Sequence, residues 1–459
     1  MRGSHGWAEI TLEDKRKLIE HIVHGTAPSG PFHIELDLTD RCNVDCYFCN
    51  AMDVRTREQI PYERIVEIVD ACVPNGLRSV RFAGGGDPLF HREIEQVIDY
   101  VHSRGVVIDN ITTNGVGLSH SVAERLVRGK TREIVISLNA ANAADYERMM
   151  QVKPAIFDKV IANVQHLLQI RGDSPHPGVV VQFLLDRENY ARLAEMYALA
   201  RRIGADIVAV NVVTEIPLDR IDKTLLLLAN DSDLLRPFLR EVIDADRDLH
   251  LLHFGFPFQQ MHAIVSELER ELATSLTPSF PTASSFREEN GHCFFGYYSA
   301  VVRGNGDMYP CCMLIKPDYK PLGNGAGGDF IDQNWKGPDF TQLRQEMREV
   351  MLAGNEIEYQ EGKFRTLAPQ CVNAHACGLK NMYFRSDEQF YRELGEALDE
   401  TRRREIRLTG NRQQLARSLY RAKMRHPRLK RVYDRVIAWS PALRRWIKAA
   451  FGVRMSSAS

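Results

Sequence analysis

Short apolar runs alternate with amphipathic segments of helical period through the first half of the chain. The apolar runs suit buried strands, and the segments between them suit helices packed on one face. Strands that alternate with helices form βα units, so we expect a parallel sheet surrounded by helices. The predicted strands are 32–38, 78–83, 107–112, 132–138, 178–185 and 206–213, and the predicted helices between them are 61–73, 91–104, 119–129, 155–171 and 189–203.

The segments outside this alternation follow other patterns. Residues 11–24 begin with a Thr-x-x-Asp sequence close to a capping box and continue at helical period, so we expect a helix there. Residues 216–290 break the alternation, with helical stretches at 225–228 and 233–243 and a Ser/Thr/Pro-rich linker at 276–290. This segment is predicted to connect the sheet to a second domain.

The composition narrows the class of protein. With 459 residues, 44% of them hydrophobic and 26% charged, the chain resembles an ordinary soluble protein of two to three domains. No apolar run approaches the ~20 residues of a membrane span. The start, Met1 to His5, resembles a tag remnant rather than a targeting signal. Without an export signal, and with reduced thiols needed, we expect a cytoplasmic protein.

The net charge of −1 is the sum of a basic C-terminal tail and an acidic remainder of the chain. Residues 401–454 hold 17 Arg and Lys against two acidic residues, and Ser440-Pro441 begins an amphipathic basic helix. Such a helix packs on its own domain, docks on a partner or lies peripherally on an anionic membrane surface. Because the tail lacks a base-stacking motif, nucleic-acid binding is not expected.

Cysteines cluster directly after the first predicted strand. Cys42, Cys46 and Cys49 follow the spacing C-x3-C-x2-C, so they supply three thiolates rather than four. Three thiolates leave one iron of a [4Fe-4S] cluster open to a non-protein ligand. A zinc site would need a fourth nearby ligand, and His33 and His91 are poorly placed for that role. A disulfide set is disfavoured because nine cysteines cannot all pair.

This spacing, with Phe48 before the last cysteine, resembles the signature of the radical S-adenosylmethionine (radical SAM) superfamily. The resemblance covers residues 31–215 and implies a partial (βα)6 TIM-like barrel. It also implies that the open iron binds S-adenosyl-L-methionine (SAM), and that the reduced cluster cleaves SAM to a 5′-deoxyadenosyl radical. A small electron donor of flavodoxin or ferredoxin type is then expected as a partner.

The same resemblance implies which other residues bind the cofactor. A glycine-rich loop after the second strand matches the loop whose backbone meets the SAM amino group, although the family usually has Glu where Asp87 stands. Polar residues at later strand ends match positions that contact the ribose and carboxylate. Asn114 is equally consistent with a turn before Gly115, and Gln182 and Asn211 are equally consistent with the barrel wall. The implied cofactor-binding set is Phe48, Gly84, Gly85, Gly86, Asp87, Asn114, Ser137, Asn139, Gln182 and Asn211.

A second group of cysteines begins after the linker. Its pattern is Cys293-x12-Gly306-x4-Cys311-Cys312 and then Cys371-x5-Cys377. It resembles the SPASM-type extension of radical SAM enzymes, which binds auxiliary iron-sulfur clusters, although Ala368 and Asn381 stand where two further cysteines are expected. Five thiols cannot ligate two clusters, so we expect one auxiliary [4Fe-4S] cluster, as in the shorter twitch form. Its expected ligands are Cys293, Cys311, Cys371 and Cys377, a set that also suits zinc.

Two cysteines are left over. Cys72 lies with Ile65, Ile68 and Val69 on the apolar face of a predicted helix and is expected in the core. Cys312 has three roles open to it: a ligand in place of Cys311, an inert core thiol, or a hydrogen-atom donor to a substrate radical. The last role is one that a free cysteine has in some radical epimerases of the family.

The resemblance therefore implies a radical SAM enzyme that takes hydrogen from a C–H bond and oxidises, epimerises or rearranges its substrate. About thirty residues precede the first strand, too few for the peptide-recognition domain of many peptide-modifying relatives. That favours a small-molecule substrate, such as a sugar, an aminocyclitol or a natural-product intermediate. The alternatives are a maturase that modifies a peptide or protein and a non-catalytic iron-sulfur protein for regulation or electron transfer.

The expected fold class is α/β: the partial barrel, a small α+β auxiliary-cluster domain and a basic helical tail. The expected domain boundaries are 1–30 for an N-terminal helix, 31–215 for the barrel, 216–290 for the helical connection, 291–395 for the auxiliary-cluster domain and 396–459 for the tail.

Overall fold

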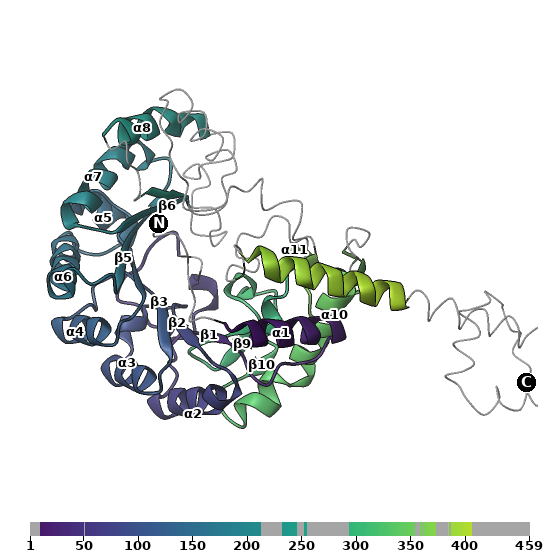
Figure 1. Cartoon of the computed structure of the whole chain (residues 1–459). Helices are drawn as coiled ribbons and strands as arrows, with labels where there is room; N and C mark the ends of the chain where they lie inside the picture. The colour runs from purple at the N-terminus through teal and green to yellow at the C-terminus, as the bar shows by residue number, and fades with distance from the viewer. Residues whose placement is uncertain are drawn as a thin grey trace, which may run out of the picture. The chain divides into compact units, whose positions relative to one another are not determined.

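Figure 1 shows the computed structural model of the chain. The structure describes residues 10–49, 51–212, 232–245, 252–254, 293–353, 359–360, 362–372, 384 and 387–405. The strands are β1 His33–Leu36, β2 Ser79–Phe82, β3 Val107–Thr113, β4 Glu133–Ser137, β5 Gly178–Leu185, β6 Ile207–Val212, β7 Leu252–Phe254, β8 Ser299–Val302, β9 Asp307–Tyr309 and β10 Gly323–Asn324. The α-helices are α1 Leu12–His24, α2 Tyr62–Cys72, α3 Ile94–Ser103, α4 His120–Arg128, α5 Ala143–Met150, α6 Ala155–Arg171, α7 Leu193–Ile203, α8 Ser232–Ala245, α10 Pro338–Ala353 and α11 Pro369–Val372.

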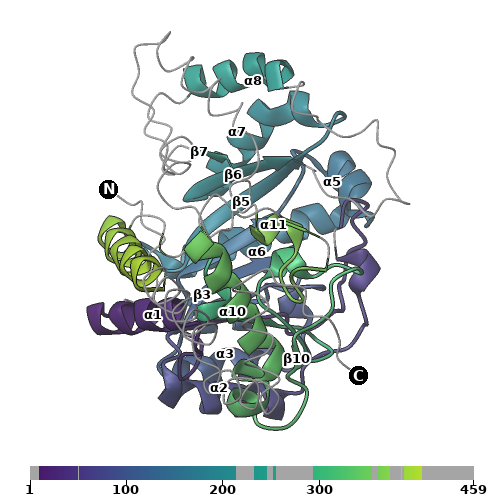
Figure 2. The same cartoon turned by 90° about the vertical axis from the view of Figure 1, so that its right-hand side faces the viewer.

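The ten strands found in the described part of the chain belong to one sheet in the order β10-β9-β8-β1-β2-β3-β4-β5-β6-β7. Neighbours from β1 to β7 are parallel, and β8 pairs with β1 in parallel as well. β9 runs antiparallel to both of its neighbours, β8 and β10. The sheet curves with α2 to α8 along its outer side, as Figures 1 and 2 show. The predicted α/β fold with a partial barrel is confirmed.

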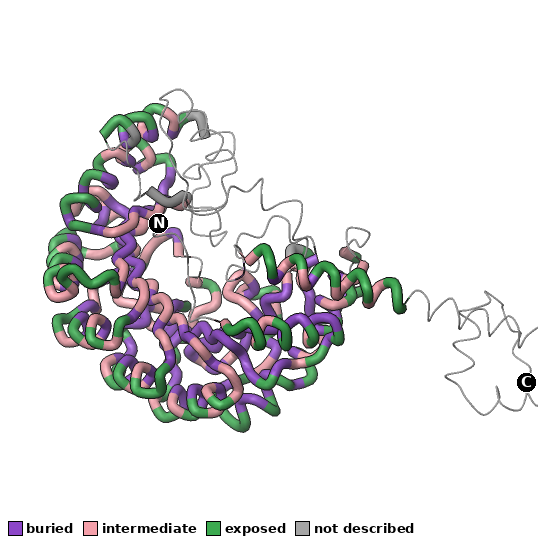
Figure 3. Tube along the Cα trace, in the orientation of Figure 1, coloured by how far each residue is buried: buried purple, intermediate pink, exposed green. Residues whose placement is uncertain are grey.

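Figure 3 marks buried and partly exposed residues along the strands of the curved sheet, and in β5 the two classes alternate from residue 181 to residue 185. Residues that point outward toward the helices, such as Ile34, Ile134 and Phe183, are fully buried and form the core. Residues that alternate with them and point inward, such as Ser137 and Gln182, keep part of their surface exposed. A buried outer face and an accessible polar inner face are what a barrel that binds a ligand inside requires.

Most elements begin and end within a few residues of the prediction. The predicted helix at 155–171 coincides with α6, and Thr11 caps α1 by accepting a hydrogen bond from the Asp14 amide (3.1 Å). The sequence missed α5, which Asn142 begins as N-cap, and the short strand β7 inside the segment predicted as a helical connection. Three residues are too few for an alternation to be visible.

The strands after residue 293 extend the barrel sheet instead of forming a separate one. Behind them, Trp335 donates from Nε1 to the carbonyl of Pro28 (2.9 Å), and Arg344 is buried with its guanidinium 4.2 Å from the Trp335 ring centre. Arg344 also donates to the carbonyls of Gly296 (3.1 Å) and Trp335 (2.8 Å). Two carbonyls and an aromatic ring therefore offset part of the cost of burying this charge, while Nη2 has no hydrogen-bond partner among the described residues.

The chain divides into two compact units, Met1–Tyr391 and Arg392–Ser459. Of the second unit the structure describes residues up to 405, which are helical. The rest of the basic tail, the predicted helical stretch at 225–228 and the linker at 276–290 lie outside the described residues. Among the residues described, the structure contains no helix that is both long and apolar enough to span a membrane.

Candidate active site

The first three cysteines lie in the loop that follows β1, residues 37–59, which we name the cluster loop. Cys42, Cys46 and Cys49 are each half-buried, and the Cys49 amide donates to the Cys46 carbonyl (3.1 Å). The loop opens at the carboxyl end of a parallel strand, the edge at which α/β barrels bind ligands.

The loop after β2, residues 83–88, packs directly on the cluster loop, and we name it the glycine loop. The amide of Gly86 donates to the carbonyl of Thr39 (3.0 Å), and that of Asp87 donates to the carbonyl of Arg41 (2.9 Å). A Cβ on Gly86 would overlap the Arg41 carbonyl, so only glycine permits this approach. The glycines are therefore needed at least to seat one loop on the other.

The donor set in the cluster loop fits an iron-sulfur cluster. Burial raises the pKa of Cys46, and the charges of Cys49 and Cys42 add to this effect, so the three thiols lie near one another. A four-iron cluster takes one thiolate per iron, and three cysteines leave one iron for another ligand. Phe48, which is 8% exposed, packs edge-on against Tyr47 with ring centres 5.2 Å apart. Cys42, Cys46 and Cys49 are therefore the residues that would hold the cluster.

Asp87 joins the glycine loop to the end of β3. Its buried carboxylate accepts hydrogen bonds from the Leu89 amide (3.0 Å), the Thr113 hydroxyl (2.9 Å) and the Asn114 amide (2.7 Å). Burial raises the pKa of Asp87 to about 6, although these donors favour the charged form. The carboxylate is thus engaged within the protein, and the predicted cofactor contact at this position stays a prediction.

Asn114 forms the turn that was one of the two roles its sequence context left open, and its cofactor contact stays a prediction. Its Oδ1 accepts from the Val116 amide (2.9 Å), which forms the turn. Its Nδ2 donates to Asn43 Oδ1 (2.6 Å) and lies 3.7 Å from Cys42 Sγ. The end of β3 therefore touches the cluster loop beside its first cysteine.

The remaining predicted cofactor residues lie on the ends of β4, β5 and β6. Ser137 on β4 and Gln182 on β5 are paired in register, and both are half-buried. Asn211 on β6 is paired with Leu184 on β5. Asn139 is buried with φ +58°, and its Oδ1 accepts from the Leu184 amide (3.0 Å). Its side chain thus joins β4 to β5, a use that its sequence position did not indicate.

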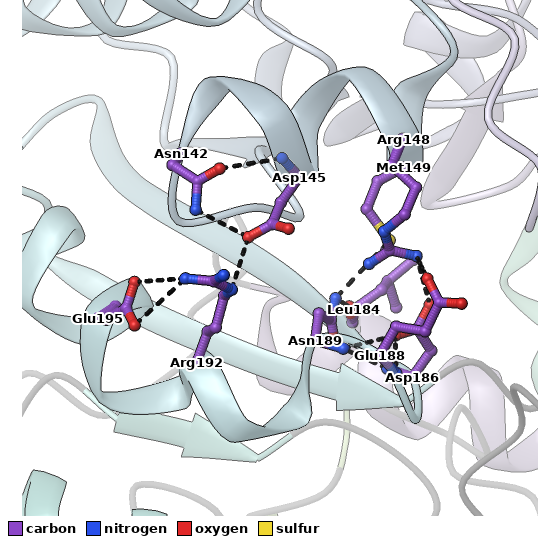
Figure 4. Close-up of polar contacts among 10 residues, drawn as sticks. All are labelled: Asn142, Asp145, Arg148, Met149, Leu184, Asp186, Glu188, Asn189, Arg192 and Glu195. Carbon is purple, nitrogen blue, oxygen red and sulfur yellow. Dashed lines mark hydrogen bonds and ion pairs between the residues drawn. The ribbon is translucent and has the colours of Figure 1, made fainter.

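A network at the end of β5 supports the cluster loop, and sequence reasoning missed it. The hydroxyl of Tyr47 contacts the carboxylate of Asp186. Figure 4 shows Asp186 accepting from the Asn189 amide (2.8 Å), with Arg148 paired to Asp186 (3.3 Å) and to Glu188 (2.7 Å). An aspartate directly after a predicted strand was the signal that could have indicated this contact.

Charged residues line the inner face of the sheet below the loops. Arg81 on β2 pairs with Glu35 on β1 (3.4 Å), and its other nitrogen lies 3.4 Å from Thr112 Oγ1. Asn110 on β3 donates to Glu133 on β4 (2.8 Å), and burial raises the pKa of Glu133. These charges on alternating strand positions were not identified in the sequence, because a hydrophobic pattern does not show which face turns inward.

Cys312 lies near charged side chains of β1 and β2. Its pKa is raised first by burial and then by the charge of Glu35, while Arg81 acts in the opposite direction. Burial and the Glu35 charge both favour the protonated thiol. The role of Cys312 as a cluster ligand, a core thiol or a hydrogen-atom donor stays a prediction.

The other cysteines of the second group are described in part. Cys293, Cys311 and Cys371 are half-buried, and Cys377 lies outside the described residues. Burial raises the pKa of Tyr319, and the nearby Cys371 and Cys311 add to the effect. The fold therefore brings these two cysteines, 60 positions apart in the sequence, to the same tyrosine.

Comparisons with known protein families identify both regions. Residues 36–200 match the radical SAM superfamily, and residues 293–359 match the SPASM iron-sulfur cluster-binding domain. The radical SAM domain implies a [4Fe-4S] cluster with SAM, and the SPASM domain implies auxiliary iron-sulfur clusters.

Two curated relatives and one solved structure resemble the chain. It is 30% identical to the PqqA peptide cyclase of Gluconobacter oxydans over 182 residues, 39% of this chain and about half (49%) of the cyclase. It is 27% identical to the mycofactocin maturase MftC of Mycobacterium tuberculosis over 346 residues, 74% of this chain and 77% of MftC. Streptococcus suis SuiB, bound to its precursor peptide SuiA, has the same fold with a TM-score of 0.54 and 19% identity, covering 72% of this chain and 71% of SuiB. The chain belongs to the radical SAM superfamily and is a radical SAM enzyme with a SPASM domain.

Proposed function

We propose that this enzyme is a maturase that modifies a residue of a peptide or protein substrate. Its support is the similarity to a peptide cyclase and to a maturase, the second of which extends over 74% of the chain. These relatives favour the peptide alternative over the small-molecule substrate expected from the sequence. The short segment before β1, on which that expectation depended, is a weaker guide than similarity along most of the chain.

The inner face of the sheet is the proposed substrate chamber. When bound, SAM and the reduced cluster supply a deoxyadenosyl radical that takes a hydrogen atom from the substrate. The chain holds the cluster through the three cysteines of the cluster loop, and Ser137 and Gln182 face the same chamber from β4 and β5. Arg81, Glu35 and Glu133 give it charged hydrogen-bonding groups that orient a polar substrate. A small low-potential protein is the proposed electron donor.

The auxiliary domain is proposed to hold one [4Fe-4S] cluster through Cys293, Cys311, Cys371 and Cys377. Cys311 and Cys371 lie near the same tyrosine, which supports their acting together. The proposed role of this auxiliary cluster is to accept an electron from the substrate radical or to support the wall of the chamber.

The proposal is tested with the full-length, reconstituted enzyme under anaerobic conditions. The enzyme is incubated with SAM, dithionite and synthetic peptides that correspond to short reading frames beside its gene. We expect 5′-deoxyadenosine to form and the mass of one peptide to change, as measured by liquid chromatography and mass spectrometry. Deoxyadenosine formation that depends on an added sugar or cyclitol, with all peptides unchanged, would overturn the peptide proposal.

Cys312 is proposed to donate a hydrogen atom from Sγ to the carbon radical of the substrate, because its thiol lies near Glu35 and Arg81 of the proposed chamber. The thiyl radical left on Sγ is returned to the thiol by one electron from the low-potential donor and one proton from solvent. Replacing Cys312 with alanine is expected to leave SAM cleavage within about twofold of wild type while formation of the normal peptide product is lost. Cys72→Ala is the matched control, since Cys72 is fully buried in α2. Unchanged product from the Cys312→Ala enzyme would exclude the donor role and leave Cys312 as part of the wall.

A further inference from the structure

The side chain of Arg55 lies between the last cluster cysteine and the glycine loop. Its Nη2 donates to Cys49 Sγ (3.0 Å), and its Nε donates to the carbonyl of Gly85 (2.6 Å). Both contacts use one planar guanidinium, so the position of the charge relative to the sulfur is fixed from two sides. No sequence motif indicated this residue, which follows the third cysteine by six positions.

A buried ion pair supports the same contact from behind. The carboxylate of Asp40 accepts from the Thr56 amide (3.0 Å) and the Thr56 hydroxyl (2.7 Å), which fixes the backbone next to Arg55. Asp40 is in turn paired with Arg303 at 3.1 Å, with both side chains almost fully buried. A Cβ on Gly85 would overlap this carboxylate, so the pair lies directly against the glycine loop.

We infer that Arg55 sets the reduction potential of the SAM-binding cluster by donating a charged hydrogen bond to the Cys49 thiolate. It acts through a cluster ligand and is a positioning residue, not a catalytic one. Arg303, from the SPASM domain, holds Arg55 in place through Asp40 and Thr56. The inference does not depend on the identity of the substrate.

The direction of the effect follows from electrostatics. Reduction adds an electron to the cluster and makes its sulfurs more negative, so a nearby positive charge and an N–H donor stabilise the reduced state more than the oxidised state. The reduction potential is therefore higher with Arg55 than without it. A higher potential makes it easier for the electron donor to reduce the cluster before SAM is cleaved.

The test is a reductive titration of the reconstituted full-length enzyme, followed by electron paramagnetic resonance. The SAM-binding cluster is identified as the signal that changes when SAM is added, which separates it from an auxiliary cluster. We expect Arg55→Gln to shift the midpoint of this signal to a lower potential and Arg55→Lys to shift it by less. The auxiliary signal is expected to keep its potential in both variants.

Arg57→Gln is the matched control. Arg57 lies two positions after Arg55, and its side chain is exposed, so the variant removes the same charge without a buried contact. Equal potentials for Arg55→Gln and Arg57→Gln would overturn the inference. Iron analysis shows whether Arg55→Gln retains the cluster. If it does not, the reduction potential of Arg55→Lys is the test, and a wild-type potential in that variant counts against the inference.

Discussion

Replacing Cys42 with alanine is expected to abolish the formation of 5′-deoxyadenosine from SAM and to remove about four of about eight irons per chain. Two thiolates cannot retain a cluster that must also keep one iron open for SAM. The measurement combines iron and sulfide analysis of the reconstituted protein with an assay of deoxyadenosine in the presence of dithionite. SAM cleavage by the Cys42→Ala enzyme would show that Cys42 is not a required ligand.

Two further variants separate the clusters. Cys371→Ala is expected to lose the other four irons while the signal that responds to SAM remains, because Cys371 and Cys311 lie near the same tyrosine, Tyr319. Cys72→Ala, which changes a thiol in the core of α2, is expected to retain both clusters. If the wild-type protein contains about four irons and one zinc per chain, the second cysteine group holds a zinc ion and not an iron-sulfur cluster.

Replacing Arg303 with alanine is expected to lower the free energy of unfolding by about 3–5 kcal/mol, the usual cost of breaking a buried ion pair. Arg303 is 2% exposed and Asp40 is 1% exposed, so the carboxylate would remain buried without its cation. The neighbouring Asp37 adds to the effect. Burial and the charge of Glu35 raise its pKa, and Arg303 opposes that rise.

Urea unfolding of the cluster-free protein under reducing conditions measures this cost. Arg303→Lys is expected to restore part of the stability, since it keeps the charge but loses the planar fork. In a double-mutant cycle, Asp40→Asn is expected to cost less in the Arg303→Ala background than in wild type. Lys17→Ala, which removes an exposed ion pair with Glu13 on α1, serves as the control and is expected to leave the unfolding midpoint nearly unchanged. A loss for Arg303→Ala no larger than for this control would show that the buried pair is not required.

The local features of the fold were predictable because they depend on neighbouring residues. Alternating apolar positions place β1 to β6, and helical periodicity places the helices between them, within a few residues of the observed bounds. The spacing of Cys42, Cys46 and Cys49 is equally local, and the match to the radical SAM superfamily confirms the class that it indicated. The short strand β7 and the helix α5 were missed because their patterns are too short or too polar to be distinctive.

The roles of single polar residues were less predictable, because each depends on the partner that the fold supplies. Asp87 and Asn139 were expected to contact the cofactor, and the structure instead shows their oxygens engaged by the end of β3 and by the Leu184 amide. Contact of Asp87 and Asn139 with the cofactor stays a prediction. No sequence pattern indicated a role for Arg55, yet its guanidinium donates a hydrogen bond to Cys49 Sγ.

By itself, the sequence determined the α/β class, the order of the barrel strands and helices, and two cysteine groups whose spacing suits iron-sulfur clusters. Only the tertiary structure decided that β8 joins the barrel sheet beside β1, that Cys312 lies near Glu35 and Arg81, and that Arg303 neutralises Asp40. The physical reason is distance along the chain. Arg303 and Asp40 are separated by 263 positions, and a contact of that kind leaves no periodic trace near either residue, because burial and charge pairing are decided only when the strands assemble.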